Sequence, residues 1–301
     1  MREDFYYPSE GEGQIHACRW SLGKGPKAIL QIVHGIAEHV ERYDHFARYM
    51  TEHGFLVVAE DHMGHGSSGN LPGYFHGGWH TAVEDTRRLL LDTRRSYPNI
   101  PYILLGHSMG SFMARTLLCK YPELPIQAAV ISGTAWQPAA AMPLIVRVME
   151  QVCAHFGETL PNEKLQNLVF GTYNAKVEHP RTPLDWVCRV NSVVDEHPMN
   201  HGFRPTAGLL RDMMEGINFI ERPGHLAAMR KELPVFFIAG GADPVGNYGK
   251  GIDACIRAFR KAGMQDITKR IYPLCRHEIL NEINREEVYE DVLQWIESKI
   301  G

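Results

Sequence analysis

One stretch decides the fold of this 301-residue chain: Tyr102-Ile103-Leu104-Leu105-Gly106-His107-Ser108-Met109-Gly110. Its first half is an apolar run typical of a buried strand, and a segment with apolar residues at helical spacing follows it. Between the two lies Gly-x-Ser-x-Gly, the pattern of a nucleophile elbow, in which a tight strand-to-helix turn exposes a serine hydroxyl. Glycine permits so tight a turn because it has no Cβ. The sequence therefore predicts that Ser108 is a nucleophile at the carboxyl end of a strand.

Apolar runs recur along the chain and alternate with segments of helical periodicity. The runs cover residues 28–33, 55–59, 102–105, 128–131, 235–239 and 267–272. Because their apolar residues are continuous rather than alternating, we expect strands that are buried on both faces, as in a parallel sheet. The sequence therefore predicts an α/β fold with a mostly parallel sheet flanked by helices.

Residues 135–222 interrupt this alternation. They contain no convincing strand, and helical periodicity is found at 143–156 and 206–217. So long an interval is too long for a simple crossover. We expect a helical cap inserted over the carboxyl ends of the strands, where open α/β sheets bind ligands. The remaining core then comprises residues 1–134 and 223–301. The apolar face of the first cap helix includes Leu144, Val148 and Met149, which either line an acyl channel or dock the cap.

A serine nucleophile needs a base, and the base needs an acid that orients it. In folds with a nucleophile elbow the chain order is Ser, then Asp or Glu, then His. Asp243 follows the run at 235–239, and His277 follows the last run. Asp253 and Asp266 are rival carboxylates, but they fall within and after the helix that separates these two runs. The sequence predicts a triad of Ser108, Asp243 and His277.

The oxyanion formed during ester cleavage needs two backbone N–H donors, one beside the nucleophile and one from the loop after the third strand. These positions correspond to Met109 and to Ile36, which follows the run at 28–33. We interpret His34, at the start of the same loop, as a residue that braces the loop.

Composition excludes several classes of function. The net charge is −4 with both signs interspersed, so we expect no nucleic-acid partner. Neither a signal-peptide pattern nor a membrane-spanning run is present. Six cysteines lie scattered without metal-binding spacing, which indicates reduced thiols and a cytoplasmic protein. The histidines between Asp61 and Ser68 suggest a metal cluster, but we interpret this segment as a structural turn, because the sequence offers no third anchored ligand. No metal site is predicted.

Three motifs resemble the monoacylglycerol lipase and lysophospholipase branch of the α/β-hydrolases, which is also grouped with the serine aminopeptidases. They are His34-Gly35-Ile36-Ala37-Glu38-His39 with Arg42-Tyr43, then Asp61-His62-Met63-Gly64-His65-Gly66, and the elbow at Ser108. Residues 174–186 and 195–203 are also similar to bacterial members described as lysophospholipases. The similarity extends from about residue 10 to the carboxyl end of the chain.

The resemblance implies a cap-gated acyl pocket and hydrolysis of single-chain lipid esters, without a metal or organic cofactor. It places Glu38 and Arg42 near a polar pocket for the glycerol head, and His34 and Gly35 at the substrate. Monoacylglycerol lipases of this branch also carry a second histidine three positions after the catalytic one, where this chain has Leu280. We therefore expect carboxylic-ester hydrolysis through an acyl-enzyme, most readily of monoacylglycerol or lysophospholipid-type esters, with at most transient contact between the cap and a membrane surface.

Two alternatives share the scaffold. A serine aminopeptidase would keep the triad and bind the substrate amine with cap carboxylates, for which Glu150, Glu158, Glu163 and Asp195 are available. A non-catalytic ligand receptor would have no need of the three triad residues, and their presence favours an enzyme.

Overall fold

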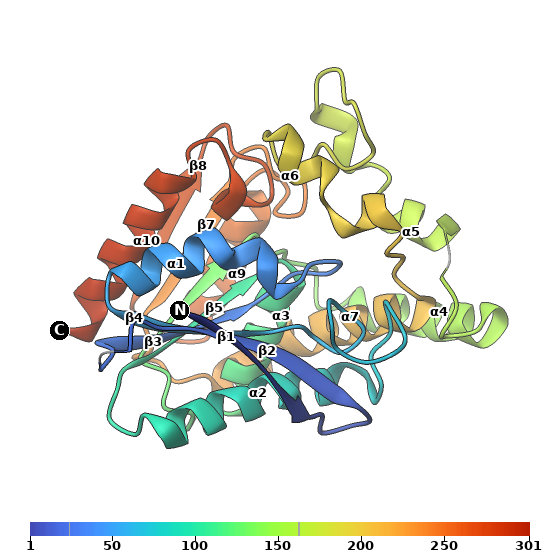
Figure 1. The fold of residues 1–301 in the computed structure, drawn as a ribbon. Coiled ribbons are helices and arrows are strands. Elements are labelled where there is room, and N and C mark those ends of the chain that lie inside the picture. The colour runs from blue at the N-terminus through green and yellow to red at the C-terminus, as the bar shows by residue number, and fades with distance from the viewer. Residues whose placement is uncertain (24, 162) are drawn as a thin grey trace.

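The computed structural model describes residues 1–23, 25–161 and 163–301 and has one eight-stranded sheet (Figure 1). The strands are β1 (Arg2–Pro8), β2 (Gln14–Trp20), β3 (Ala28–Val33), β4 (Phe55–Glu60), β5 (Tyr102–His107), β6 (Ala128–Ser132), β7 (Val235–Gly240) and β8 (Ile267–Tyr272). Their order across the sheet is β1-β2-β4-β3-β5-β6-β7-β8. The pairs from β4 to β8 are parallel, whereas β1 and β2 pair antiparallel with each other and with β4. The α/β fold predicted from the sequence is confirmed.

Helices cover both faces of the sheet, because alternate residues of each central strand point to opposite sides. Leu30 and Ile32 of β3 pack with α1 (Asp44–Glu52) and α10 (Arg285–Ile300). Ile29 and Val33 pack on the opposite face with α2 (Gly78–Ser96), α3 (Met109–Lys120) and α9 (Lys250–Lys261). All six residues of β3, β4, β5 and β7 are buried, which explains their continuous apolar sequence.

Two features of the sheet differ from the sequence prediction. β1 and β2 were not predicted from the sequence. Residues 2–8 mix charged with aromatic side chains, because β1 is an outer strand and does not need a continuous apolar sequence. β8 lies where predicted, but it is not buried on both faces: Lys269 and Arg270 are exposed. The reason is that β8 forms the edge of the sheet, so solvent reaches it.

The segment between β6 and β7 contributes helices and no strand of the sheet among its described residues. The helices are α4 (Met142–Phe156), α5 (Glu163–Phe170), α6 (Asn191–Asp195), α7 (Ala207–Ile220) and α8 (Pro223–Ala228), with 3-10 turns at Tyr173–Lys176 and Pro198–His201. The helices predicted at 143–156 and 206–217 are therefore confirmed. Thr206 caps α7, because its hydroxyl accepts a hydrogen bond from the Leu209 N–H.

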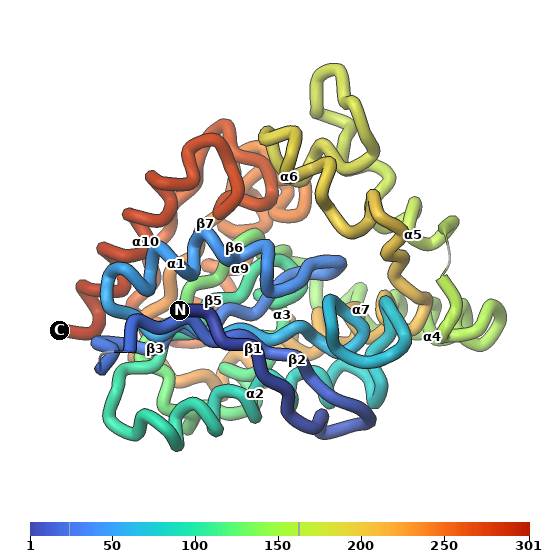
Figure 2. Tube along the Cα trace, in the orientation of Figure 1, coloured from blue at the N-terminus to red at the C-terminus, as the bar shows by residue number. Residues whose placement is uncertain are grey.

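This inserted segment has an outer and an inner part. α4 and α5 lie on the side of the molecule opposite the C-terminus, and α6 lies at the top of the view (Figures 1 and 2). α7 packs against α2 and α3 of the core. Arg115 of α3 ties both ends of the segment to the core, since it donates to the Ala135 carbonyl at 3.0 Å and to Glu221 at 3.0 Å. The boundaries 135–222 for a separate cap remain a prediction. None of the described helices is both long and apolar enough to span a bilayer.

Candidate active site

The register of the sheet brings the predicted residues to one edge. Val33 lies opposite Gly106, and His107 lies opposite Ser132, so the loops after β3, β5 and β6 emerge side by side. Gly240 lies opposite Tyr272, which places the loops after β7 and β8 next to each other. Parallel strands present their carboxyl ends at the same edge of a sheet. The site is assembled there.

Ser108 has φ 52° and ψ −122°, a conformation that is strained for any residue with a side chain. Two close approaches hold it. A Cβ at Gly106 would overlap the carbonyl oxygen of Gly110, and a Cβ at Gly110 would overlap that of Val33. The Ser108 N–H donates to the Ser132 carbonyl at 3.0 Å. Both glycines are therefore required by space, and the elbow predicted from the sequence is present.

His277 and Asp243 form a buried pair. His277 Nδ1 lies 2.9 Å from Asp243 Oδ2, and Asp243 Oδ1 accepts from the Val245 N–H at 2.8 Å. Burial alone would lower the pKa of His277, but the charge and hydrogen bond of Asp243 raise it above 6.5. The rival carboxylates lie elsewhere, since Asp253 and Asp266 pair with Lys269 and Lys299.

The loop after β3 lies against the elbow. A Cβ at Gly35 would be 3.0 Å from the Cβ of Ser108, so the backbone of Gly35 and Ile36 passes close to the nucleophile. Within the described part of the chain, neither the N–H of Ile36 nor that of Met109 hydrogen-bonds to another group. Both donors are thus available at the positions where an oxyanion hole is predicted.

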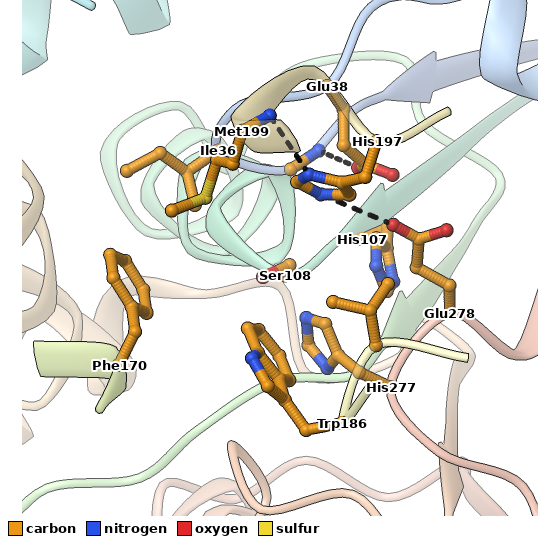
Figure 3. A pocket seen from close by; sticks show the side chains of 12 residues that line it. Ile36, Glu38, His107, Ser108, Phe170, Trp186, His197, Met199, His277 and Glu278 are labelled. Carbon is orange, nitrogen blue, oxygen red and sulfur yellow. Dashed lines mark hydrogen bonds and ion pairs between the residues drawn. The ribbon is translucent and has the colours of Figure 1, made fainter. Parts of the chain in front are cut away.

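A small cavity of about 20 Å³ lies beside Ser108 and has two unlike ends (Figure 3). Apolar side chains line one end, and polar side chains line the other. The apolar set is Ile36, Phe170, Trp186, Val187 and Met199; the polar set is Glu38, His107, His197 and Glu278, with Gly35, Ser108 and His277 between them. Such an arrangement suits an amphiphilic ester.

The polar end contains a buried charge network. Arg42 donates to Glu278 at 2.6 Å and lies 3.6 Å from Glu38. Burial opposes ionisation of Glu278, but the charge of Arg42 lowers its pKa. Burial and the charge of Glu278 raise the pKa of Glu38, which accepts from the Gly35 N–H at 2.6 Å and from the Tyr43 hydroxyl at 2.8 Å. The charges of Arg42 and Glu278 offset each other, and Glu38, with its pKa raised to about 7, is only partly ionised at neutral pH.

The predicted pocket residues fall into two groups. Gly35 and Glu38 line the cavity, and Arg42 reaches it through Glu278. His34 does not line it: its Nδ1 donates to the Gly35 carbonyl at 2.7 Å and its Nε2 accepts from the His62 N–H at 3.0 Å. His34 therefore braces the loop, as its position suggested, and the expectation that it borders the substrate is not met.

The three residues of α4 also lie away from this cavity. Met149 is buried in the main core, because this face of α4 packs on α7. Leu144 is 68% exposed and Val148 49% exposed, since they occupy the opposite, solvent-facing side of the helix. The expectation that these residues line an acyl channel beside Ser108 is not met by this arrangement.

Several residues of the cavity were not predicted. Glu278 and His107 are the sequence neighbours of the predicted residues His277 and Ser108, so their place beside the active site could have been predicted from the sequence. Phe170, Trp186, His197 and Met199 come from the inserted segment. No strand register positions that segment, and its spacing along the sequence gave no indication of which side chains turn inward.

The turn after β4 is held by Asp61. Its carboxylate accepts from the Val40 N–H at 2.8 Å and from the Ser67 N–H at 2.9 Å, and it lies 2.7 Å from His16 Nδ1. These bonds agree with a structural turn rather than with a metal cluster.

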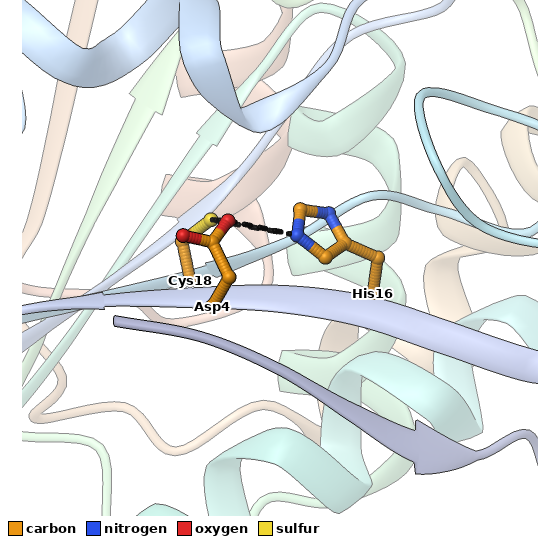
Figure 4. Close-up of side chains that lie close together, drawn as sticks. All are labelled: Asp4, His16 and Cys18. Atoms are coloured by element: carbon orange, nitrogen blue, oxygen red, sulfur yellow. Dashed lines mark hydrogen bonds and ion pairs between the residues drawn. The ribbon is translucent and has the colours of Figure 1, made fainter. Parts of the chain in front are cut away.

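Among the described residues, Asp4, His16 and Cys18 bring three potential metal ligands together (Figure 4). This proximity of β1 and β2 was not visible in the cysteine spacing. Asp4 Oδ1 lies 3.0 Å from His16 Nε2, accepts from Cys18 at 3.1 Å and also pairs with Arg2 at 2.7 Å. Asp61 raises the pKa of His16 against the effect of burial. Because each donor atom is already engaged, we interpret the group as a hydrogen-bonded network that joins β1 and β2 to the Asp61 turn.

Comparison with known proteins agrees with this architecture. Residues 24–284 match the family model described as serine aminopeptidase, S33. The chain is 29% identical to a monoacylglycerol lipase of Mycolicibacterium smegmatis over 99% of this chain and 98% of that protein. It is 25% identical to the human monoglyceride lipase, covering 99% and 91% of the two chains. A thermostable carboxyl esterase of Bacillus coagulans, solved in complex with glycerol, superposes with a TM-score of 0.89 at 26% identity, covering 100% of this chain and 99% of that one. The chain belongs to the serine aminopeptidase S33 family of α/β-hydrolases.

Proposed function

We propose that this protein is a serine ester hydrolase that cleaves monoacylglycerol-type esters through an acyl-enzyme. The observation that carries the proposal is the strained Ser108 beside the buried His277–Asp243 pair, at a cavity with one apolar and one polar end. Relatives over the full length of the chain are named monoacylglycerol and monoglyceride lipases, which supports the same substrate class.

In the proposed mechanism, His277 takes the proton of Ser108 while the serine oxygen attacks the ester carbonyl. The N–H groups of Ile36 and Met109 bind the oxyanion. Asp243 keeps the Nδ1 proton of His277 in place, so that Nε2 acts as the base. His277 then returns the proton to the leaving alcohol, and water cleaves the acyl-enzyme by the same steps in reverse order.

The charge balance of the cavity favours an uncharged leaving alcohol. Arg42 and Glu278 neutralise each other, and burial favours the protonated form of Glu38. A phosphate group would meet no unpaired positive charge there, and burying an unpaired charge is costly. We therefore propose a preference for glycerol esters over lysophospholipids.

The peptidase alternative receives no comparable support. Glu150, Glu158, Glu163 and Asp195 are all exposed, and none of them lines the cavity. Glu158 and Asp195 are moreover paired with Arg211 and Arg181. A substrate ammonium group would thus find no free carboxylate beside Ser108 in the described part of the insertion.

Transient contact with a lipid surface is part of the proposal. Large apolar side chains of the outer inserted segment face solvent, namely Leu144, Val148, Phe156, Leu160 and Leu168. Apolar side chains gathered in one region commonly mark an interaction site. A single-chain lipid must leave a membrane or micelle to reach Ser108, and these residues offer a surface for that transfer.

A direct test compares 1-decanoylglycerol, decanoyl lysophosphatidylcholine and alanine p-nitroanilide as substrates of the purified protein. The glycerol ester should be hydrolysed fastest, the lysophospholipid more slowly, and the anilide not at all. Cleavage of the anilide at a rate comparable with that of the glycerol ester would contradict the proposal and favour the aminopeptidase alternative.

A further inference from the structure

His197 presents one hydrogen-bond donor to the polar end of the cavity. It comes from the inserted segment and is 4% exposed. Its Nδ1 accepts from the Met199 N–H at 3.3 Å, so the ring proton of the neutral form is on Nε2. Burial lowers the pKa of His197 to about 4, so the ring is neutral near pH 7. His197 therefore acts there as a fixed donor through Nε2.

Glu278 presents the matching acceptor. Its Oε2 is engaged by Arg42 at 2.6 Å and by the Asn281 amide at 3.0 Å. Its Oε1 makes no hydrogen bond to another described residue and lies 3.7 Å from His197 Nε2 (Figure 3). This separation is too long for a direct hydrogen bond. An oxygen atom placed to one side of this gap can accept from His197 and donate to Glu278, as bridging waters do between polar groups more than about 3.5 Å apart.

A third polar atom beside this gap is also unsatisfied. His107 Nε2 is buried and has no hydrogen-bond partner among the described residues, and its side chain lines the same cavity. Buried polar atoms normally have partners. An unsatisfied atom together with a donor and acceptor held apart indicates that a polar ligand group completes this end of the cavity.

Leu280 does not contribute to the polar end of the cavity. The second histidine expected three residues after His277 is replaced by Leu280, which is buried in the core against α10 and does not line the cavity. Leu280 therefore supplies no hydrogen-bond donor at this end of the cavity. His197 lies at the cavity, although it is far from His277 in the sequence.

We propose that His197 and Glu278 together bind a hydroxyl group of the leaving alcohol, with His197 donating from Nε2 and Glu278 accepting at Oε1. This inference rests on the proposed ester hydrolysis at Ser108 and identifies the residues that make the site specific for polyol esters. An alkyl ester has no such hydroxyl, so the hydrogen-bonding atoms of His197 and Glu278 stay unsatisfied when it binds. Leaving buried polar atoms without partners weakens the binding of that substrate.

The test compares 1-decanoylglycerol with methyl decanoate, which have the same acyl chain and differ in the leaving alcohol. The quantity measured is the ratio of kcat/KM for the two esters. His197→Phe should lower this ratio about tenfold, the effect of one lost hydrogen bond. His197→Gln keeps an amide donor at a similar reach and should restore much of the ratio, whereas His197→Asn is too short and should not.

Met199→Leu is the matched control, since Met199 lines the same cavity from the same segment without a polar group. It should change both esters by the same factor. The Gln and Asn variants decide the test if the Phe variant does not fold. The inference would be overturned if the ratio stayed within twofold of the wild-type value in both His197→Phe and His197→Asn. If the Phe variant is unfolded, the same result in His197→Asn alone would overturn it. Wild-type protein inactive on both esters would refute the proposed function itself.

Discussion

At the scale of single residues, the Asp243 carboxylate is fully buried and bound by His277 and the Val245 N–H. Asp243→Asn preserves the shape of the side chain but stabilises the wrong tautomer of His277. We expect the fold to be retained and kcat for 1-decanoylglycerol to fall on the order of 10⁴-fold, by analogy with serine proteases. Circular dichroism and steady-state kinetics check the two parts. Turnover near the wild-type value would mean that another carboxylate orients the base.

The same pair sets the pH dependence. His277 must be neutral to accept the serine proton, and Asp243 raises its pKa above 6.5. Activity should therefore be lost as the pH falls through a value above 6.5. In Asp243→Asn the residual activity should persist to lower pH, because burial then acts without the compensating charge. If the wild-type protein and Asp243→Asn lost activity at the same acidic pH, Asp243 would not be the group that raises the pKa of His277.

Gly110 illustrates a residue that is fixed by space. A Cβ at this position would overlap the Val33 carbonyl oxygen and come within 2.5 Å of that of His34. Gly110→Ala should lower the thermal midpoint by several degrees and displace the elbow, because backbone groups cannot move aside cheaply. Gly224→Ala, in α8 with nothing within 4 Å of the added methyl group, is the control and should leave the midpoint almost unchanged. Equal midpoints in the two variants would contradict this reason for the glycine.

At the scale of elements, the two sides of α4 have different roles. Met149 packs inward on α7, while Leu144 and Val148 face solvent. Leu144→Glu with Val148→Glu should leave the thermal midpoint unchanged and slow hydrolysis of micellar 1-decanoylglycerol several-fold, because a charge opposes contact with a lipid surface. Hydrolysis of dissolved p-nitrophenyl acetate should not slow.

Leu22 provides the control for this surface effect. It is 59% exposed in the loop between β2 and β3, away from α4. Leu22→Glu should leave both rates unchanged. A similar loss with Leu22→Glu, or equal losses on the two substrates in the α4 variant, would show that α4 does not deliver the lipid.

The elements also show where sequence patterns are sufficient. Strands β3, β4, β5 and β7 could be predicted because burial on both faces requires continuous apolar residues. β1 lay outside that pattern, because an outer strand needs no such run. For α4, periodicity predicted the helix, but it did not indicate which part of its broad apolar surface packs on α7 and which part stays exposed.

At the scale of the whole molecule, the core part of the site could be predicted because parallel strands deliver their following loops to one edge. That rule brought the loops bearing Ile36, Ser108, Asp243 and His277 together from the order of strands alone. It does not apply to the inserted segment, whose residues reach the cavity through tertiary packing. Trp186 and His197 were for that reason not predicted, although they line the same cavity as Ser108.

The central claim is that Ser108 forms the acyl-enzyme, and covalent labelling tests it most directly. The purified protein is treated with a fluorophosphonate probe, its intact mass is measured, and the labelled peptide is sequenced by mass spectrometry. We predict a single adduct on Ser108, complete loss of 1-decanoylglycerol hydrolysis, and neither labelling nor hydrolysis in a folded Ser108→Ala variant. An adduct that maps to another residue and persists in Ser108→Ala, together with undiminished hydrolysis by that variant, would contradict the account.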